Sequence, residues 1–367
     1  MIGKMSKRQF ILLFMTVIAS PLIRGFPFVL TETAKQAGWL VPLASSVILF
    51  GLMVLMNEIF KKNQGKNLIQ LCCDILTRPV GIAVAIIYLG WIVILLGFYI
   101  RYFGEHIVAN IMSESALEFI MLSMLILVGV MQSKSIIYYA RLNELIFSCF
   151  VLVLVATGVI LLFTRVEIDN LLPVSQRDIK PILKGGLQGI AILGHYMFIF
   201  FMFDDVKSTK KSLRLEMQSV SAVWILSTLV MVGAIGSIGY NAVLSFNDSY
   251  FTIAKNIDIL GFLERLDAIL LAMWVLADFT TITIFGHIAT SIVRTALAGL
   301  YEGKGFARQA YTSYIILIAA YLTAVFGFKS KFELEMFARN AFVVCNIVMS
   351  LALPVILFTV GKLRKLV

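Results

Sequence analysis

Residues 20–28 read Ser-Pro-Leu-Ile-Arg-Gly-Phe-Pro-Phe and interrupt the first hydrophobic segment of the chain. Pro21 and Pro27 each remove a backbone hydrogen-bond donor, and Gly25 between them favours an irregular backbone. Arg24 adds a charge that hydrocarbon excludes unless the side chain faces protein or water. A helix broken in this way at membrane depth leaves free N–H and C=O groups, which can bind a polar ligand. The stretch therefore predicts a broken spanning helix and a binding site beside it.

The composition of the whole chain predicts an integral membrane protein. Of its 367 residues 60% are hydrophobic and 14% are charged, and the mean hydropathy is +0.94, which no soluble core of this size could accommodate. A short basic end before the first segment superficially suggests a signal peptide. The segment is too long for one, however, and contains Arg24 and Glu32. We therefore expect it to be retained as a spanning helix.

Apolar stretches of about 20 residues predict ten spans in an all-α membrane fold. The predicted spans are 8–37 (broken), 39–60, 79–104, 117–132, 138–163, 182–203 (broken), 215–243, 265–298, 307–327 and 334–361. The stretch 67–77 is too short to span and is better interpreted as an interfacial amphipathic helix. No soluble domain remains, so we expect residues 1–367 to form a single polytopic membrane domain.

The distribution of Lys and Arg predicts the orientation of these spans. The loops on the side that holds both termini contain 19 basic residues, and the loops on the other side contain 11. Because basic loops stay in the cytoplasm, both termini are expected to be cytoplasmic. The net charge of +10 is then mainly a topology signal and does not indicate nucleic-acid binding.

Ten spans with a break in the first suggest a five-helix unit repeated in inverted orientation, here 8–163 and 182–361. The sixth span would then contain the second break, and it carries Gly185, Gly186, Gly189 and Gly194. Glycines in membrane helices also serve close packing. Four of them within ten residues favour an unwound binding segment over packing.

Several short motifs, in this order and spacing, resemble the permease-like B subunits of spore germinant receptors, within the amino acid, polyamine and organocation transporter superfamily. They are Ser6-Lys-Arg-Gln-Phe, Ala37-Gly38-Trp39, Asn170-Leu-Leu-Pro173, Phe262-Leu-Glu-Arg-Leu-Asp-Ala-Ile-Leu270 and Met273-Trp-Val275. The resemblance spans nearly the whole chain. It implies a fold like that of the bacterial leucine transporter, with an amino acid or similar small germinant bound at the midplane. It also implies partner A and C subunits in the lipid of the spore inner membrane.

A zwitterionic ligand needs N–H groups for its carboxylate, acceptors for its ammonium group and an apolar wall for its side chain. The two breaks supply the backbone groups, and aromatic residues on the third, sixth and eighth spans supply the wall. The candidate ligand-binding residues from these segments are Ser20, Pro21, Arg24, Gly25, Phe26, Tyr99, Gly186, Gly189 and Tyr196, with Phe98, Phe198 and Phe279 as further wall residues. Each aromatic could instead serve packing alone.

The eighth span contains Asp278-Phe-Thr-Thr-Ile-Thr283, the most polar cluster inside any predicted helix. In the fold that the resemblance implies, the eighth helix faces the break in the first. Asp278 would then pair with Arg24 or accept a proton, and Thr280 and Thr281 would contact the ligand or a sodium ion. An Arg24–Asp278 bridge with a purely structural role is the alternative.

Other charged or titratable residues allow two interpretations each. His195 either relays protons or is a satisfied core histidine. Arg101 and Glu105, spaced i, i+4, form a helix pair or an entrance gate. The group Glu264, Arg265 and Asp267 gates the entrance, docks a partner or is simply solvated.

The sequence contains no phosphate loop, metal-spaced His or Cys cluster or nucleophile elbow, so we expect no enzyme activity, no cofactor and no metal. Three functions remain. The first is a germinant sensor whose partner subunits respond to ligand binding, and the second is a proton- or sodium-coupled amino acid transporter. The third is a membrane scaffold without a ligand. The family resemblance favours the sensor, whereas broken helices and inverted repeats by themselves favour transport.

Overall fold

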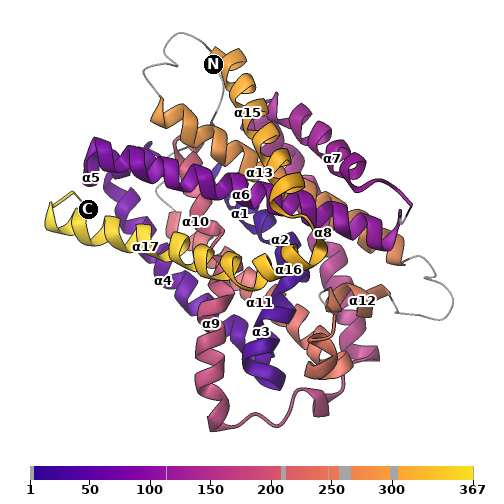
Figure 1. The fold of residues 1–367 in the computed structure, drawn as a ribbon. Helices are drawn as coiled ribbons and strands as arrows, with labels where there is room; N and C mark the ends of the chain where they lie inside the picture. The colour runs from indigo at the N-terminus through magenta and orange to yellow at the C-terminus, as the bar shows by residue number, and fades with distance from the viewer. Residues whose placement is uncertain are drawn as a thin grey trace.

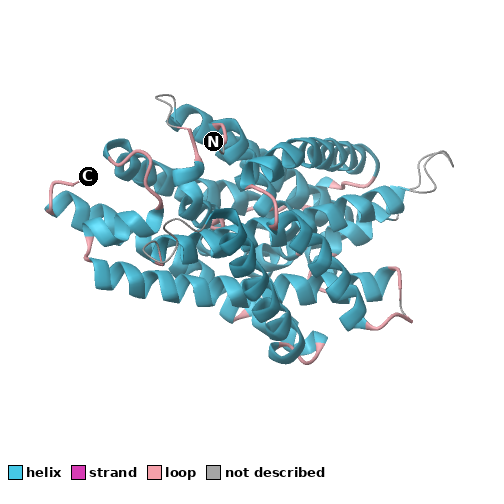
Figure 2. Ribbon diagram, turned by 90° about the horizontal axis from the view of Figure 1, so that it is seen from above, coloured by secondary structure: helices cyan, strands magenta, loops and turns pink. Residues whose placement is uncertain are grey.

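The computed structural model describes residues 4–112, 114–207, 212–246, 248–255, 266–297 and 305–366. These residues form helices and short loops (Figures 1 and 2). The described residues contain no strand, and an isolated parallel bridge joins Met5 to Val206. The all-α prediction is therefore confirmed.

The helices of the first half of the chain are α1 (Lys7–Val17), α2 (Ala19–Ile23), α3 (Gly25–Ala34), η1 (Lys35–Leu40), α4 (Val41–Lys62), α5 (Leu68–Ile75), α6 (Arg78–Asn110), α7 (Leu117–Gln132) and α8 (Ile136–Thr164). Those of the second half are η2 (Ile168–Asn170), η3 (Gln176–Asp178), α9 (Ile179–Leu193), α10 (Tyr196–Ile199), η4 (Phe200–Asp205), α11 (Ser212–Val243), α12 (Ser249–Lys255), α13 (Leu266–Ala296), α15 (Gly305–Leu322), η5 (Thr323–Gly327), α16 (Lys331–Arg339) and α17 (Ala341–Leu363).

Eight helical stretches among the described residues are long and apolar enough to cross a membrane. α7 is also apolar but has 16 residues, about 24 Å at 1.5 Å per residue, which is shorter than a typical hydrocarbon core of about 30 Å. The chain is therefore a multi-pass membrane protein. The short helix α5 corresponds to the predicted interfacial segment.

The first predicted break is present, and it has two interruptions. α1 begins with a capping box between Ser6 and Gln9 and ends at Val17, and α2 begins at Ala19. α2 ends at Arg24, whose φ of −88° and ψ of −84° are not helical. Pro21 and Pro27 each lie in the first turn of the helix that follows an interruption, where a missing N–H costs little.

The second predicted break is a tight turn at Gly194, one of the four predicted glycines, and the other three lie in regular helix. α9 runs without interruption through Gly185, Gly186 and Gly189, and the chain leaves this helix at Gly194, before the short helix α10. The three glycines pack against α4. A Cβ at Gly189 would lie 2.2 Å from Ser45 Oγ, and a Cβ at Gly186 would lie 2.6 Å from the Cβ of Ala44. These glycines allow close helix packing.

The interrupted helices lie in the interior of the bundle (Figure 1). α1 packs against α8, α13, α11 and α10, and α2 packs against α13. The N-terminal end of α1 is fixed by an ion pair between Lys7 and Glu216 at 2.7 Å, and both side chains are buried. At the same end, Arg294 of α13 pairs with Asp204 at 2.9 Å. These contacts join α1 to α11 and η4 to α13, whereas the break of the first span contacts α6 and α13 through Arg24.

Candidate ligand-binding site

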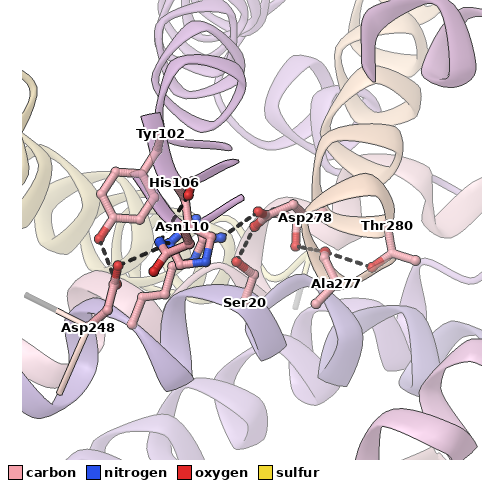
Figure 3. A network of polar contacts seen from close by, with 10 residues as sticks. Ser20, Tyr102, His106, Asn110, Asp248, Ala277, Asp278 and Thr280 are labelled. Carbon is pink, nitrogen blue, oxygen red and sulfur yellow. Dashed lines mark hydrogen bonds and ion pairs between the residues drawn. The ribbon is translucent and has the colours of Figure 1, made fainter. Parts of the chain in front are cut away.

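A buried ion pair joins the break of the first span to α13. Arg24 Nη2 donates to Asp278 Oδ2 at 2.7 Å, and each residue is 2% exposed. Ser20 Oγ donates to the other carboxylate oxygen, Oδ1 (Figure 3). The structure therefore brings together three residues that the sequence analysis had singled out on two different spans. Both carboxylate oxygens are satisfied, as a buried charge requires.

The Arg24 guanidinium also stacks on two aromatic rings. Its Cζ lies 4.9 Å from the ring centroid of Tyr102 on α6 and 4.6 Å from that of Trp274 on α13. Both distances are within the range of cation–π attraction. Arg24 Nε and Nη1 are nevertheless buried without a hydrogen-bond acceptor among the described residues. Arg24 thus keeps a charge and unused donors in a nearly dry environment.

One face of α6 connects this ion pair to its surroundings. Tyr99, Tyr102 and His106 follow one another at spacings of three and four, so they lie on the same side of the helix over about 10 Å. Tyr99 lies within hydrogen-bond distance of His195, with 3.3 Å between Oη and Nε2. Tyr102 is at the level of Arg24, and His106 packs against Trp274 with 4.4 Å between ring centroids.

Asp248, just before α12, connects that segment to α6 (Figure 3). Tyr102 Oη donates to Asp248 Oδ1 at 3.4 Å, and His106 Nδ1 lies 3.2 Å from Oδ2. Burial by itself raises the pKa of Asp248, but the His106 hydrogen bond and the nearby Arg24 charge, together with the Tyr102 hydrogen bond, hold it below its ordinary value. The ionised carboxylate therefore fastens the α12 segment to α6.

A cavity of about 310 Å³ lies beside this network. Its walls come from the end of α6, the segment before and within α12, and α16. The lining residues are Tyr102, Glu105, His106, Ala109, Asn110, Ser245, Phe246, Asp248, Phe251, Thr252, Lys331, Leu334 and Glu335. Glu105 is also paired with Arg101 at 2.8 Å, as the spacing of the two residues predicts. Tyr102 and His106 separate the cavity from Arg24 and Trp274.

On the other side of the ion pair lies a tightly packed aromatic cluster around the second break. Tyr99 stacks on Phe285 at 5.8 Å, and His195 is fully buried beside them. Tyr196 packs edge-on against Phe14 of α1 at 4.3 Å, and its hydroxyl has no partner among the described residues. The two breaks therefore meet through aromatic side chains.

The remaining predicted site residues occupy varied positions. Pro21 and Phe26 are buried, whereas Gly25 is partly exposed and no atom lies within 4 Å of an added Cβ. Thr280 and Thr281 are buried, and both hydroxyls donate to Ala277 O of their own helix, so neither has its proton free for a ligand.

Gly186 and Gly189 contact α4 and are part of a regular helix, so they do not supply unwound backbone to the site. Glu264 and Arg265 lie outside the described residues, and of Asp267 the backbone is described but not the side chain.

Sequence reasoning missed Tyr102, His106 and Asp248 as members of the site, and it noted Trp274 as a family feature only. The shared helix face of Tyr99, Tyr102 and His106 was a usable signal, because a ligand-facing Tyr99 implies that the same face continues one and two turns further on. Asp248 follows a loop and gives no such periodic signal. In the part of the chain that the structure describes, no three His, Cys, Asp or Glu side chains converge on a possible metal position.

Comparison with known proteins agrees with this architecture. A sequence profile described as spore germination protein matches residues 4–333. Putative spore germination protein YfkT of Bacillus subtilis (strain 168) is 24% identical over 69% of this chain and 69% of its own. Spore germination protein A2 of the same organism is 22% identical over 78% of this chain and 76% of its own.

Among solved structures, the crystal structure of MhsT in complex with L-phenylalanine superposes with a TM-score of 0.68 at 13% identity, covering 95% of this chain and 89% of MhsT. At this identity the likeness shows a shared fold, that of the leucine-transporter type. Together with the multi-pass helical architecture, the profile match shows that this chain is a membrane permease of the spore germination protein family.

Proposed function

We propose that the protein is the ligand-sensing subunit of a spore germinant receptor and binds an amino acid or a similar small germinant beside the first broken helix. The observation that carries this proposal is Arg24, which is 2% exposed, paired with Asp278 and left with two unused nitrogen donors. A buried cation with free donors is costly unless a ligand uses them. The spore germination family and the shared transporter fold make a small-molecule germinant the natural candidate.

The proposal includes a topology and an assembly. Ten spans in two inverted repeats, 8–163 and 182–361, would form a single membrane domain with both termini in the cytoplasm, embedded in the lipid of the spore inner membrane. In this orientation the cavity beside α12 opens to the outside, and the Lys7–Glu216 end faces the cytoplasm. Partner A and C subunits would respond to the state of this domain.

Signalling then requires a ligand that binds one conformation of the domain better than another. The ligand would enter through the outer cavity, displace Tyr102 from Arg24 and His106 from Trp274, and reach the aromatic cluster of Tyr99 and His195. Ordering of this layer would draw α12 and α6 together through Asp248. The partner subunits would respond to that shift.

The test is a substitution at Gly25, where an added side chain points into open space. Gly25→Leu should abolish germination triggered by amino acids, with protein abundance maintained, because the leucine fills volume that the ligand needs. Gly90→Leu is the matched control, since Gly90 is exposed on α6 and also has no atom within 4 Å of an added Cβ. An unchanged germinant dose–response in Gly25→Leu spores would remove this segment from the site.

A proton- or sodium-coupled amino acid transporter is the second candidate, favoured by the fold shared with MhsT and by the two broken helices. The two functions separate in proteoliposomes that contain this protein alone. A sensor should bind radiolabelled amino acids saturably and accumulate little of them under an imposed proton or sodium gradient. Strong gradient-driven uptake would instead establish transport.

A further inference from the structure

The buried polar atoms around Arg24 are unequally divided between donors and acceptors. The unpartnered atoms include Arg24 Nε, Arg24 Nη1 and Trp274 Nε1, and none of these nitrogens can accept a hydrogen bond. Arg24 and Trp274 are each 2% exposed, and the guanidinium lies 4.6 Å from the indole ring. Three unused donors therefore lie in one small, buried region.

The carboxylates in the same region are already engaged, whereas His106 Nε2 is buried without a partner, and its role as donor or acceptor depends on the tautomer. Asp278 accepts from Ser20 through one oxygen and from Arg24 through the other. Asp248 likewise accepts from Tyr102 through one oxygen and contacts His106 through the other. Each carboxylate oxygen of these two residues therefore already has one partner, so an incoming ammonium group would have to share it.

The state of Trp274 differs from that of two other tryptophans in the chain. Trp91 donates its Nε1–H to Asn346 Oδ1 at 2.8 Å, and Trp39 donates to the Leu171 carbonyl at 3.3 Å. Buried indole nitrogens usually find such a partner. The indole of Trp274 is fixed by ring contacts to Phe251 and His106, so its orientation is held without an acceptor.

We propose that this donor cluster recognises a carboxylate, which accepts from Arg24 and from Trp274 Nε1. The recognised compounds are therefore carboxylic acids, amino acids among them, and the α-amino group contributes little to binding. The inference rests on the proposed ligand site and names the chemical class of its ligand. A carboxylate has lone pairs for several N–H donors and supplies a negative charge beside a cation that is already partly neutralised by Asp278.

The surroundings suit a small anion that arrives from the cavity. The cavity of about 310 Å³ ends at Tyr102, His106 and Phe251, and these three side chains contact Arg24 or Trp274. A shift of Tyr102 would open the guanidinium to the cavity. The faces of Tyr102 and Trp274 stabilise the cation while the site is empty, which is how a guanidinium with unused donors persists there.

The test compares matched compounds on the full chain in nanodiscs. The probes are propionate, L-alanine and L-alaninamide, and the larger set 4-methylpentanoate, L-leucine and L-leucinamide, all at millimolar concentrations. Binding is measured as a ligand-dependent rise in melting temperature and as a change in tryptophan fluorescence. In at least one set the acid and the amino acid should bind with similar affinity, and the amide should not bind.

Trp274→Phe removes one N–H and keeps an aromatic face over Arg24. It should weaken binding of the acid and of the amino acid by about tenfold each, the value of one hydrogen bond to a charged group. Trp224→Phe is the control, because Trp224 is 37% exposed on α11, and its affinities should be unchanged. The melting temperature of each variant without ligand checks that it folds. Arg24→Lys keeps the positive charge but removes the forked set of guanidinium donors, so it should abolish binding of both the acid and the amino acid.

Three results would overturn the inference in different ways. Amide binding as tight as that of the amino acid, still blocked by Gly25→Leu, would leave the ligand site in place and refute carboxylate recognition. Carboxylate binding that is insensitive to Trp274→Phe, to Arg24→Lys and to Gly25→Leu would place the anion elsewhere and refute the proposed site as well. Absence of binding by all six compounds would refute both the proposed ligand site and carboxylate recognition for these ligands.

Discussion

The Arg24–Asp278 ion pair can be tested by removing its charges one at a time and then together. The variants are Arg24→Met, Asp278→Leu and the double substitution. Met approximates the volume of the Arg side chain, Leu is larger than Asp, and each replacement removes the charge. Arg24→Met leaves the Asp278 carboxylate with Ser20 as its remaining donor, and Asp278→Leu leaves the guanidinium without any acceptor among the described residues.

The expected magnitudes follow from the burial of both groups. Removal of one member of a buried pair leaves an uncompensated charge and costs about 3–5 kcal/mol, whereas replacement of both by apolar groups is often nearly neutral. Both residues are 2% exposed at a separation of 2.7 Å, so solvent offers little screening. The single variants should therefore each lose about 3–5 kcal/mol, and the double variant should recover most of one such loss.

The measurement is the free energy of unfolding, from dodecyl sulfate titration in mixed micelles, with thermal melting as a second readout. Lys66 and Asp74 provide a matched control, because their ion pair is also short, at 2.8 Å, but 43% and 50% exposed. Lys66→Met and Asp74→Leu should each cost about 0–1 kcal/mol. Germination should not return in the Arg24/Asp278 double variant, since the donors of Arg24 are gone.

Strict additivity of the two single effects would refute the partnership. Asp278 would then be an independent proton or ligand site, and Arg24 a residue that lines a wet cavity. Small single effects, of the size expected for the control pair, would show instead that water reaches both charges.

Two further predictions concern the supports of the site. Asp248→Asn should lower the unfolding free energy by about 1 kcal/mol at neutral pH, because the charge that strengthens two hydrogen bonds is lost. The pKa of Asp248 is lowered in the folded protein, so the ionised carboxylate contributes to stability above the ordinary aspartate pKa of about 3.9. This contribution to stability is lost as the pH falls through the pKa of the folded protein. The melting curves of wild type and Asp248→Asn should therefore converge in acid. Gly186→Leu should reduce membrane abundance sharply, because even a Cβ at this position would lie 2.6 Å from the Cβ of Ala44. Gly90→Leu should leave abundance unchanged, since no atom lies within 4 Å of an added Cβ there. Equal abundance of the two variants would contradict the close packing of α9 on α4.

The membrane class and the position of the first break could be predicted from local features of the sequence. Hydrophobic length and charge spacing can be read from residues that are near one another in the sequence. Pro21 and Pro27 cannot continue a helix from the preceding turn, because the ring of each clashes with the carbonyl four residues earlier. The residue types of the central ion pair were also readable, because a charge within a span must find a partner. Arg24 and Asp278 were therefore predictable as a pair once a fold that brings the two spans together was assumed.

The tertiary structure decided the features that depend on which helix faces which. The sequence does not show whether Gly186 and Gly189 belong to an unwound segment or to a packed helix. In the structure α4 contacts the backbone at both glycines, so their role is close packing. Asp248 becomes part of the network because α12 returns to the end of α6. Trp274 differs from Trp39 and Trp91 because its indole nitrogen has no acceptor, and only the three-dimensional surroundings of a side chain show whether an acceptor is present.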